Sequence, residues 1–171
     1  ADATQTPGGT GALRLAADFI ARCLPGRSVW LSDPTWPIHE SLFAAAGVRV
    51  SHYPYVDADN HLDVEAMLSA LERVPHGDVV LLHACCHNPT GFDLAYNDWQ
   101  RVLDVVRRRE LLPLLDFAYQ GLGDGLEEDA RAVRLFADSL SEVLITSSCS
   151  KNFGLYRERT GALIVCAGSA A

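Results

Sequence analysis

Apolar and polar positions alternate along this chain with two different periods. Short continuous apolar runs such as Val79–His83 are typical of strands that are buried on both faces. Longer segments with apolar residues three and four apart indicate amphipathic helices, and in Asp98–Arg109 the pattern turns apolar side chains inward and Arg107–Arg109 outward to solvent. Strand and helix in turn predict an α/β fold, with helices on both faces of one sheet.

The same pattern gives approximate bounds for each element. The predicted strands are Val29–Leu31, Val48–Tyr55, Val79–His83, Leu111–Leu115, Val143–Thr146 and Ala162–Cys166. The predicted helices are Leu13–Ala21, Ile38–Ala46, a segment from an N-cap at Asp63 to about Val74, Asp98–Arg109 and a segment around Ala130–Ala137. No repeat or linker interrupts the pattern, so we expect one domain over residues 1–171.

Polar side chains directly follow three of the predicted strands. Asn88, Asp116 and Lys151 each come soon after an apolar run. Open α/β sheets bind ligands beyond the carboxyl ends of their strands, so we expect these three side chains to share one site. Tyr119 adds a phenol, and Arg159 adds a guanidinium beside several hydroxyls. A lysine amine, a carboxylate, a phenol and a phosphate-sized polar cluster are the groups needed to hold pyridoxal phosphate.

Composition narrows the class of partner. Acidic residues outnumber basic ones by 22 to 14, and the net charge of −8 argues against nucleic acid or an anionic membrane as the main partner. No apolar run approaches the length of a membrane span, and residues 1–5 do not read as a signal peptide. The five cysteines are irregularly spaced and predict no disulfide framework, so we expect a cytoplasmic location.

A glycine-rich segment, Thr6–Ala12, precedes the first predicted helix. Glycines allow close approach of a ligand to the backbone, and the free N–H groups at a helix start attract anions. With the Thr10 hydroxyl this segment could form an anion cradle. It is not a P-loop, because no Gly-Lys-Ser/Thr follows, and a simple glycine-rich turn before a helix is the alternative interpretation.

Five runs in this sequence together resemble the large domain of a known enzyme family. They are Thr6–Ala12, Ser32–Pro37, His83–Gly91, Asp116–Gly121 and Ser148–Arg159. In this order and spacing they are similar to the class I, fold-type I pyridoxal-phosphate aminotransferases of the aspartate and aromatic amino acid subgroup. The resemblance covers essentially the whole chain. It implies a three-layer αβα sandwich with a mixed, mostly parallel sheet, which is the large domain of these enzymes.

The resemblance also implies catalytic roles for three residues. Lys151 matches the lysine that forms the Schiff base with the cofactor and, once free, transfers a proton. Asp116 matches the carboxylate that pairs with the pyridine nitrogen and keeps the ring protonated. Tyr119, together with Asn88, matches the groups that hydrogen-bond the phenolic oxygen of the cofactor.

The remaining matched residues would bind or orient the cofactor. Trp36 resembles the aromatic residue that stacks on the cofactor ring. Four positions match the phosphate ligands, with an arginine fork holding two oxygens and a helix start supplying N–H donors: Gly9, Thr10, Ser148 and Arg159. His39 and His83 resemble histidines that stand behind the carboxylate at Asp116, although a satisfied core histidine is an equally good interpretation of each.

Two other motifs favour different chemistry and are discounted. Cys85-Cys86-His87 is compatible with metal binding, but adjacent side chains should project in different directions and no second ligand pair follows at zinc spacing. We therefore expect structural thiols and no metal. Ser148–Lys151 fits the Ser-x-x-Lys pattern of serine β-lactamases and penicillin-binding proteins, but the partner motifs of that class are missing or misplaced: Ser32–Pro34 precedes the lysine, and Lys-Thr-Gly does not occur.

The resemblance implies transamination between aspartate or an aromatic amino acid and 2-oxoglutarate, by a ping-pong route in a homodimer. Residues 1–171 would then be a large domain without the N-terminal segment and the C-terminal small domain of the family. The arginines that bind the substrate carboxylates lie in those missing parts. The alternative hypothesis is a truncated large domain that binds the cofactor weakly or not at all and has no turnover. Another reaction on the same fold, such as that of a lyase or decarboxylase, is a third possibility.

Overall fold

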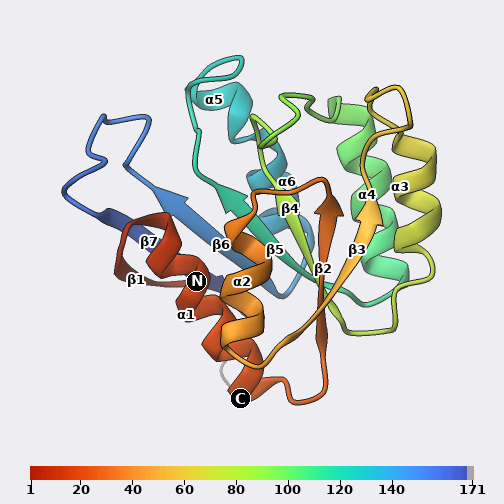
Figure 1. Ribbon diagram of the computed structural model, residues 1–171, viewed down its shortest axis with the longest axis horizontal. Helices are drawn as coiled ribbons and strands as arrows, with labels where there is room; N and C mark the ends of the chain where they lie inside the picture. The colour runs from red at the N-terminus through yellow and green to blue at the C-terminus, as the bar shows by residue number, and fades with distance from the viewer. Residues whose placement is uncertain (169–171) are drawn as a thin grey trace.

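A seven-stranded sheet forms the centre of the chain in a computed structural model, which describes residues 1–168 (Figure 1). The strands are β1 (Asp2–Pro7), β2 (Ser28–Asp33), β3 (Arg49–Pro54), β4 (Val79–His83), β5 (Leu112–Phe117), β6 (Val143–Ser148) and β7 (Thr160–Cys166). The helices are α1 (Gly8–Cys23), α2 (Ile38–Ala45), α3 (Val64–Leu71), α4 (Tyr96–Arg108), α5 (Leu126–Asp129) and α6 (Arg131–Ser139). Among these helices, none is long and apolar enough to cross a membrane.

The sheet is mixed and mostly parallel. Its order is β1-β7-β6-β5-β4-β2-β3. Strands β2 to β6 pair in parallel, whereas β7 runs antiparallel to both β6 and β1. The carboxyl ends of β2, β4, β5 and β6 therefore meet at one edge of the sheet, where the loops that follow them can build a site.

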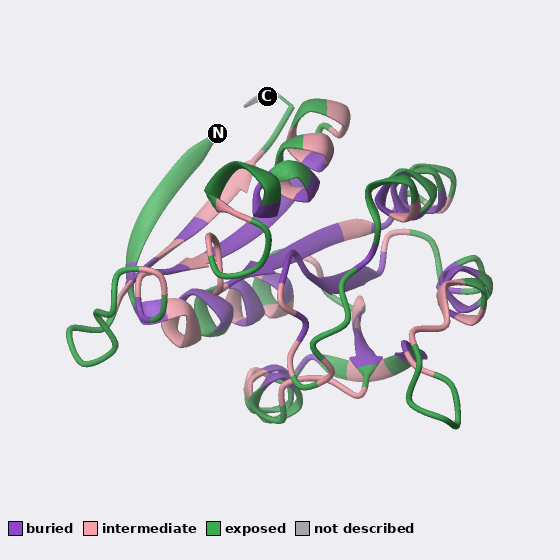
Figure 2. Cartoon of the chain, turned by 90° about the horizontal axis from the view of Figure 1, so that it is seen from above, coloured by how far each residue is buried: buried purple, intermediate pink, exposed green. Residues whose placement is uncertain are grey.

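Two apolar cores hold the three layers together. One face of the sheet packs against α1 and α2, through residues such as Leu13, Ile20 and Phe43. The other face packs against α3, α4 and α6, through Trp99 and Phe136 among others. Figure 2 shows the central strands buried between helices whose outer sides are exposed. The predicted αβα sandwich with a mostly parallel sheet is confirmed.

Most predicted elements occur within a few residues of their expected bounds, and two were missed. Strand β1 has no apolar alternation, because it is an exposed edge strand held by its pairing with β7. Helix α5 is a single four-residue turn, too short to show a period. Helix α1 begins at Gly8 rather than Leu13, since its apolar stripe starts one turn after its backbone becomes helical.

Two predictions about helices, the cap at Asp63 and the solvated face at Arg107–Arg109, can be compared with the structure. Asp63 caps α3 as predicted, accepting a hydrogen bond from the Ala66 N–H at 2.9 Å. The prediction that Arg107–Arg109 form only a solvated face is wrong in part. Arg109 is half-buried and donates to the Val74 carbonyl, and Arg107 donates to the Ser139 carbonyl. These arginines join α4 to neighbouring segments while keeping much of their charge in water.

Gly161 in β7 lies against the first turn of α1. A Cβ atom at this position would come within 2.5 Å of the Gly8 carbonyl carbon and 2.6 Å of the Ser147 carbonyl oxygen. Both neighbours are backbone atoms, so neither can rotate away. This contact sets the distance between the start of α1 and strands β6 and β7.

We expect Gly161→Ala to lower the free energy of unfolding by about 1–3 kcal/mol, because overpacking against backbone forces the chain to shift. Urea denaturation of the variant and of the unchanged chain measures this difference. Ala162→Ser, a similarly small addition at the neighbouring residue, is the matched control and should change stability by less than about 1 kcal/mol. Equal midpoints for Gly161→Ala and the unchanged chain would contradict the packing argument.

Candidate active site

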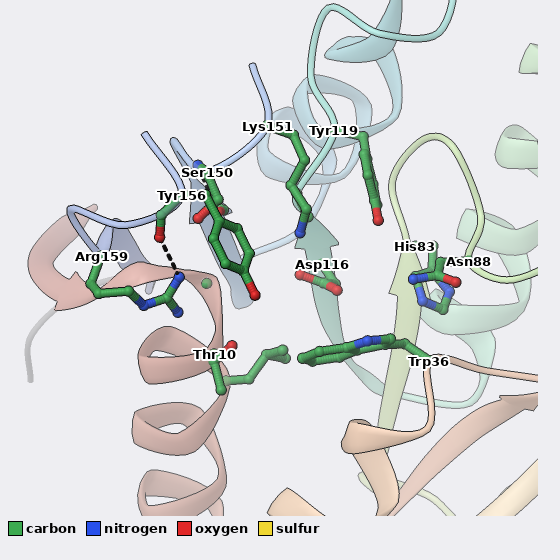
Figure 3. Close-up of a pocket in the computed structure, with 14 residues that line it drawn as sticks. Thr10, Trp36, His83, Asn88, Asp116, Tyr119, Ser150, Lys151, Tyr156 and Arg159 are labelled. Atoms are coloured by element: carbon green, nitrogen blue, oxygen red, sulfur yellow. Dashed lines mark hydrogen bonds between the residues drawn. The ribbon is translucent and has the colours of Figure 1, made fainter. Parts of the chain in front are cut away.

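A pocket of about 280 Å³ opens at the carboxyl ends of the parallel strands (Figure 3). Loops after β2, β4, β5 and β6 line it together with the first turn of α1. Every residue predicted to contact the cofactor belongs to its wall, namely Gly9, Thr10, Trp36, Asn88, Asp116, Tyr119, Ser148, Lys151 and Arg159. His83 also lines the pocket.

Asp116 is the buried acid of this pocket. It lies in β5, at the register position that pairs with His83 in β4 and Thr146 in β6. Burial opposes its ionisation, but hydrogen bonds outweigh that cost and lower its pKa. Thr146 donates its hydroxyl proton to Oδ1 at 2.8 Å, and His39 Nε2 lies 3.3 Å from Oδ2. The pocket therefore holds a fixed negative charge at its inner end.

His39 stands behind Asp116 rather than in the pocket wall. It lies in α2, and its Nδ1 is 2.8 Å from the Thr35 hydroxyl, so both ring nitrogens have partners. The Trp36 indole meets the His39 ring edge-on, with 5.3 Å between centroids. The chain Thr35–His39–Asp116 orients the carboxylate, as the prediction for His39 requires.

His83 differs from His39 because neither of its ring nitrogens has a hydrogen-bond partner among the described residues, although both are buried. Burial lowers its pKa to about 4, so the ring is neutral near pH 7. Unpaired buried polar atoms are costly in proteins. Because His83 lines the pocket, a polar ligand is the partner that its nitrogens can acquire.

Lys151 and Tyr119 point into the pocket from one side, and the Trp36 indole lies across the other (Figure 3). The Lys151 Nζ atom is 5.0 Å from the centroid of the Tyr119 ring. Lys151 follows β6 in a turn, so its amine reaches back over the strand ends towards Asp116. An amine, a phenol and a carboxylate thus converge on one pocket, which the Trp36 indole bounds on one side.

The start of α1 forms an anion cradle at the other end of the pocket. The first turn of α1 contains no acidic residue, and no side chain caps it. The N–H groups of Gly9 and Thr10 therefore carry the positive end of a sixteen-residue helix towards Ser148 and Arg159.

The cradle depends on the small size of its glycines. A Cβ at Gly8 would lie 2.7 Å from Arg159 Nη2, and one at Gly9 would lie 3.1 Å from Ser148 Cβ. Arg159 is held in place by a 2.9 Å hydrogen bond to the Tyr156 carbonyl. Backbone amides, a hydroxyl and a guanidinium are together suited to a phosphate dianion.

Asn88 is positioned by a network that the sequence did not reveal. Its neighbour His87 stacks on Tyr55, with 3.8 Å between ring centroids and an interplanar angle of 9°. The His87 Nε2 atom lies 3.0 Å from the Ser32 hydroxyl, and Nδ1 lies 2.9 Å from the Thr90 hydroxyl. This bonded and stacked ring holds the loop that carries Asn88 to the pocket.

The chemistry of the donor set fits pyridoxal phosphate. A polar, ring-shaped ligand with a phosphate would meet the cradle at one end and Asp116 at the other. It would also give His83 a polar partner. The ordered arrangement of amine, phenol, carboxylate and indole around one space is what such a ring requires.

Some residues of the pocket were not predicted. The wall also includes Leu13, Ala118, Ser150 and Tyr156. Ser150 and Tyr156 lie within a run that resembles the family, so their neighbourhood was the available signal. The role of Thr146 was hidden, because it reads as the last residue of an ordinary strand. Its hydroxyl meets Asp116 only through the pairing of β5 with β6.

One of the two reasons given for discounting Cys85 and Cys86 as metal ligands, that adjacent side chains project in different directions, is wrong. Their Sγ atoms and a carboxylate oxygen of Asp129 all lie within 4.8 Å of one another. Adjacent side chains usually diverge, but Cys86 has a φ of 50°, in the left-handed region, and this conformation brings the two thiols together. All five cysteines lie within the described residues and are free thiols there.

Comparison with known proteins defines the class of protein to which this site belongs. The family model for "Aminotransferase class I and II" matches residues 1–170. The chain therefore belongs to the class I and II aminotransferase family. The fold and the order of the site residues agree with this membership.

Individual relatives narrow the comparison. The chain is 84% identical over 170 residues to an aromatic-amino-acid aminotransferase from Pseudomonas aeruginosa, covering 99% of this chain and 43% of that protein. It is 52% identical over 164 residues to an aspartate aminotransferase from Escherichia coli, covering 95% of this chain and 41% of that protein. The chain thus spans less than half the length of these relatives.

Solved structures share the fold. One is a crystal structure of an aromatic-amino-acid aminotransferase from Burkholderia pseudomallei that is covalently bound to pyridoxal phosphate. It matches with a TM-score of 0.95 and 49% identity over 98% of this chain and 42% of that one. An aromatic amino acid aminotransferase from Burkholderia cenocepacia matches with the same TM-score of 0.95 and 50% identity, over 98% of this chain and 42% of that one.

We expect Thr146→Val to destabilise the chain by about 2 kcal/mol, because the Asp116 carboxylate loses a charge-assisted hydrogen bond while it stays buried. The pKa of Asp116 should rise for the same reason. Urea denaturation at neutral pH measures the loss. Thr4→Val, on the exposed edge strand, is the control and should leave the midpoint unchanged. Equal stability of the two variants would show that this hydroxyl does not support the carboxylate.

The buried histidines predict a pH dependence of stability. The pKa of His83 is about 4 in the folded chain against an ordinary value of 6.5, because burial disfavours its charged form; burial likewise lowers that of His87 to about 3. At pH values below 6.5 but above these lowered values, the two histidines bind protons in the unfolded chain and not in the folded chain. The stabilisation is therefore complete above pH 6.5 and declines as the pH falls towards 4, by about 3 kcal/mol for His83 alone.

Urea denaturation at several pH values between 6.5 and 4 tests this expectation. His83→Gln should show a shallower dependence, because one proton-binding group is removed from the unfolded state. His61→Gln, at an exposed histidine, is the control and should follow the unchanged chain. A slope that is the same in all three proteins would contradict burial of a neutral His83.

Proposed function

We propose that this chain is the cofactor-binding part of a pyridoxal-phosphate-dependent aminotransferase that acts on an aromatic amino acid or aspartate, with 2-oxoglutarate as the second substrate. The observation that carries the proposal is the convergence of Lys151, Tyr119 and Asp116 on a pocket closed at its far end by the α1 cradle. Family membership and the pyridoxal phosphate bound by a structural relative support it.

Each residue would hold the cofactor at a different place. Gly9 and Thr10 would bind its phosphate through their backbone N–H groups, with Ser148 and Arg159 adding a hydroxyl and a guanidinium. When bound, pyridoxal phosphate supplies a protonated ring that withdraws electrons from the substrate α-carbon.

The inner end of the pocket would tune that ring. Asp116 would keep a proton at the ring nitrogen, because its lowered pKa keeps the carboxylate ionised. The hydrogen bonds from Thr146 and His39 fix its two oxygens for this task. Trp36 would exclude water from one side of the ring and limit its tilt.

Lys151 would bind the aldehyde carbon of the cofactor through its amine. When not bonded to the cofactor, the same amine would serve as the acid and base that moves a proton to and from the substrate α-carbon. Tyr119 and Asn88 would donate hydrogen bonds to the phenolic oxygen. A ping-pong exchange between an amino acid and a 2-oxo acid is the reaction that this set of groups can support.

The aromatic or aspartate donor is proposed from the relatives alone. The relative that is 84% identical is named as an aromatic-amino-acid aminotransferase, and one that is 52% identical is named as an aspartate aminotransferase. The higher identity favours an aromatic donor. A panel of tyrosine, phenylalanine and aspartate with 2-oxoglutarate, assayed on a longer polypeptide that contains this chain, ranks the three.

A second candidate is that residues 1–171 alone bind the cofactor without turnover. The coverage of only 43% and 41% of two relatives favours it, because more than half of each relative has no counterpart in this sequence. We also propose a homodimer in a reducing cytoplasmic compartment. Exposed apolar side chains beside the pocket, at Phe153, Leu155 and Tyr156, support an interface there, and five free thiols support the compartment.

Lys151 is the only lysine in the sequence, so no other side-chain amine can react with the cofactor in a labelling test. We expect pyridoxal phosphate followed by borohydride to place one phosphopyridoxyl group on Lys151, detected by peptide mass mapping. Lys151→Arg keeps the charge but lacks an amine of suitable reactivity, and should lose the label. Asp116→Asn should reduce labelling at low cofactor concentration, because the ring loses its charged partner.

The site of labelling separates the two candidates. A label confined to Lys151, without transamination in 171 residues but with it in a longer polypeptide, supports both cofactor binding and the second candidate for this chain. A label found only on the α-amine of Ala1, and equal labelling of Lys151→Arg, would contradict the proposed cofactor site.

A further inference from the structure

Cys85 and Cys86 form a pair of thiols outside the cofactor pocket. They follow β4, and they approach Asp129, which lies at the end of the short helix α5. The two Sγ atoms and an Asp129 carboxylate oxygen all lie within 4.8 Å of one another. Two sulfur atoms at this separation can be bridged by one additional atom with little movement of the chain.

The pair is accessible from two directions. A cavity of about 140 Å³ reaches Cys85 and is also lined by Asp93, Leu94 and Trp99. Cys85 is otherwise buried, whereas Cys86 is only half-buried and can be approached from solvent. A small reagent could therefore bond first to Cys86 and then to Cys85.

The neighbouring carboxylates are already used by the backbone. Asp129 accepts hydrogen bonds from the N–H groups of Gly121, Gly123 and Asp124, at 2.8 to 3.0 Å. Asp93 accepts from the N–H groups of Cys86 and His87, at 2.7 and 2.8 Å. A ligand that took either carboxylate would have to break these loops, so the two sulfur atoms are the available donors.

Electrostatics distinguish between thiophilic ligands. Burial raises the pKa of the Cys85 thiol, and Cys86 and Asp129 add to the effect. Burial and then the Asp93 charge raise the pKa of Cys86. Both groups are therefore protonated at neutral pH. A divalent metal ion binds thiolates and must displace two thiol protons, which the raised pKa values of both thiols oppose. Arsenic(III) reacts with two neutral thiols and releases water, with no net change in charge.

We propose that Cys85 and Cys86 are a dithiol binding site for small trivalent arsenicals of the type CH₃As(OH)₂. Two As–S bonds form and two As–O bonds break. The two thiol protons leave with the two hydroxyl groups as water, and arsenic stays in the +3 state. No oxidant or reductant is needed. The second bond forms within the same molecule, so the pair should bind far more tightly than a single thiol.

Methylarsonous acid is the probe for this site. The reduced chain is treated with one equivalent, and the adduct is located by intact mass and peptide mapping. We expect a single adduct that joins Cys85 and Cys86, although the chain has five cysteines. Excess dithiothreitol should remove the adduct. 2-Mercaptoethanol at an equal thiol concentration should not, because only a dithiol can replace both As–S bonds together.

Single-residue variants make the test decisive. Cys86→Ser should weaken binding by about 100-fold, because one of the two bonds is lost. Cys23→Ser, at an exposed lone thiol, is the matched control and should bind like the unchanged chain. Circular dichroism shows whether each variant is folded. If Cys86→Ser does not fold, Cys85→Ala is the alternative variant that leaves only one thiol of the pair.

Three results would overturn the proposal. The first is an adduct that maps to Cys23, Cys149 or Cys166. The second is arsenical affinity that is unchanged in both folded Cys86→Ser and folded Cys85→Ala. The third is protection of both thiols from alkylation by micromolar Zn²⁺ but not by the arsenical, which would make the pair a metal site instead.

Discussion

The ionised carboxylate of Asp116, buried at the end of a central strand, is the constraint on which the site depends. Removing such a group from water is unfavourable, so the fold must supply compensating donors. Thr146 and His39 supply them from two other elements, and Thr35 in turn orients His39. The pairing of β5 with β6 and the placement of α2 are therefore linked to one charge. A shift of either element would weaken a hydrogen bond to the Asp116 carboxylate.

The second end of the site has the opposite electrostatic character. Helix α1 begins against β7, at a distance set by Gly161, and its uncapped first turn faces Ser148 and Arg159. The negative end at Asp116 and the positive end at α1 are held by different strands of one rigid sheet. A ligand with a basic ring nitrogen and an acidic phosphate matches both ends at once.

Most of the fold could be predicted because its sheet is buried on both faces. Short continuous apolar runs such as Val79–His83 have few interpretations other than a buried strand. The amphipathic helices show a clear helical period in the spacing of their apolar residues. Strand β1 could not be found in this way, since an exposed edge strand owes its conformation to its partner. Residues whose role depends only on their sequence neighbours, such as Asp63 as the N-cap of α3, could be predicted equally well.

The site was predictable from its motifs, but its supporting contacts were not. Lys151, Asp116 and Arg159 stand in runs that resemble a family, whereas Thr146 and the His87 network act through partners distant in sequence. Cys86 shows the limit of side-chain rules, because one positive φ reversed the expected divergence of two neighbouring thiols. Such contacts arise from register and backbone conformation, which composition and spacing do not contain.

The positive end of the pocket has a practical consequence for handling the protein. The guanidinium of Arg159 donates a 3.5 Å hydrogen bond to the Pro7 carbonyl beside the start of α1, so a dianion that settles there meets two sources of positive charge at once. Sulfate and inorganic phosphate are such dianions. Buffers that contain them would compete with a phosphorylated cofactor and raise its apparent dissociation constant, while also raising the melting temperature of the chain.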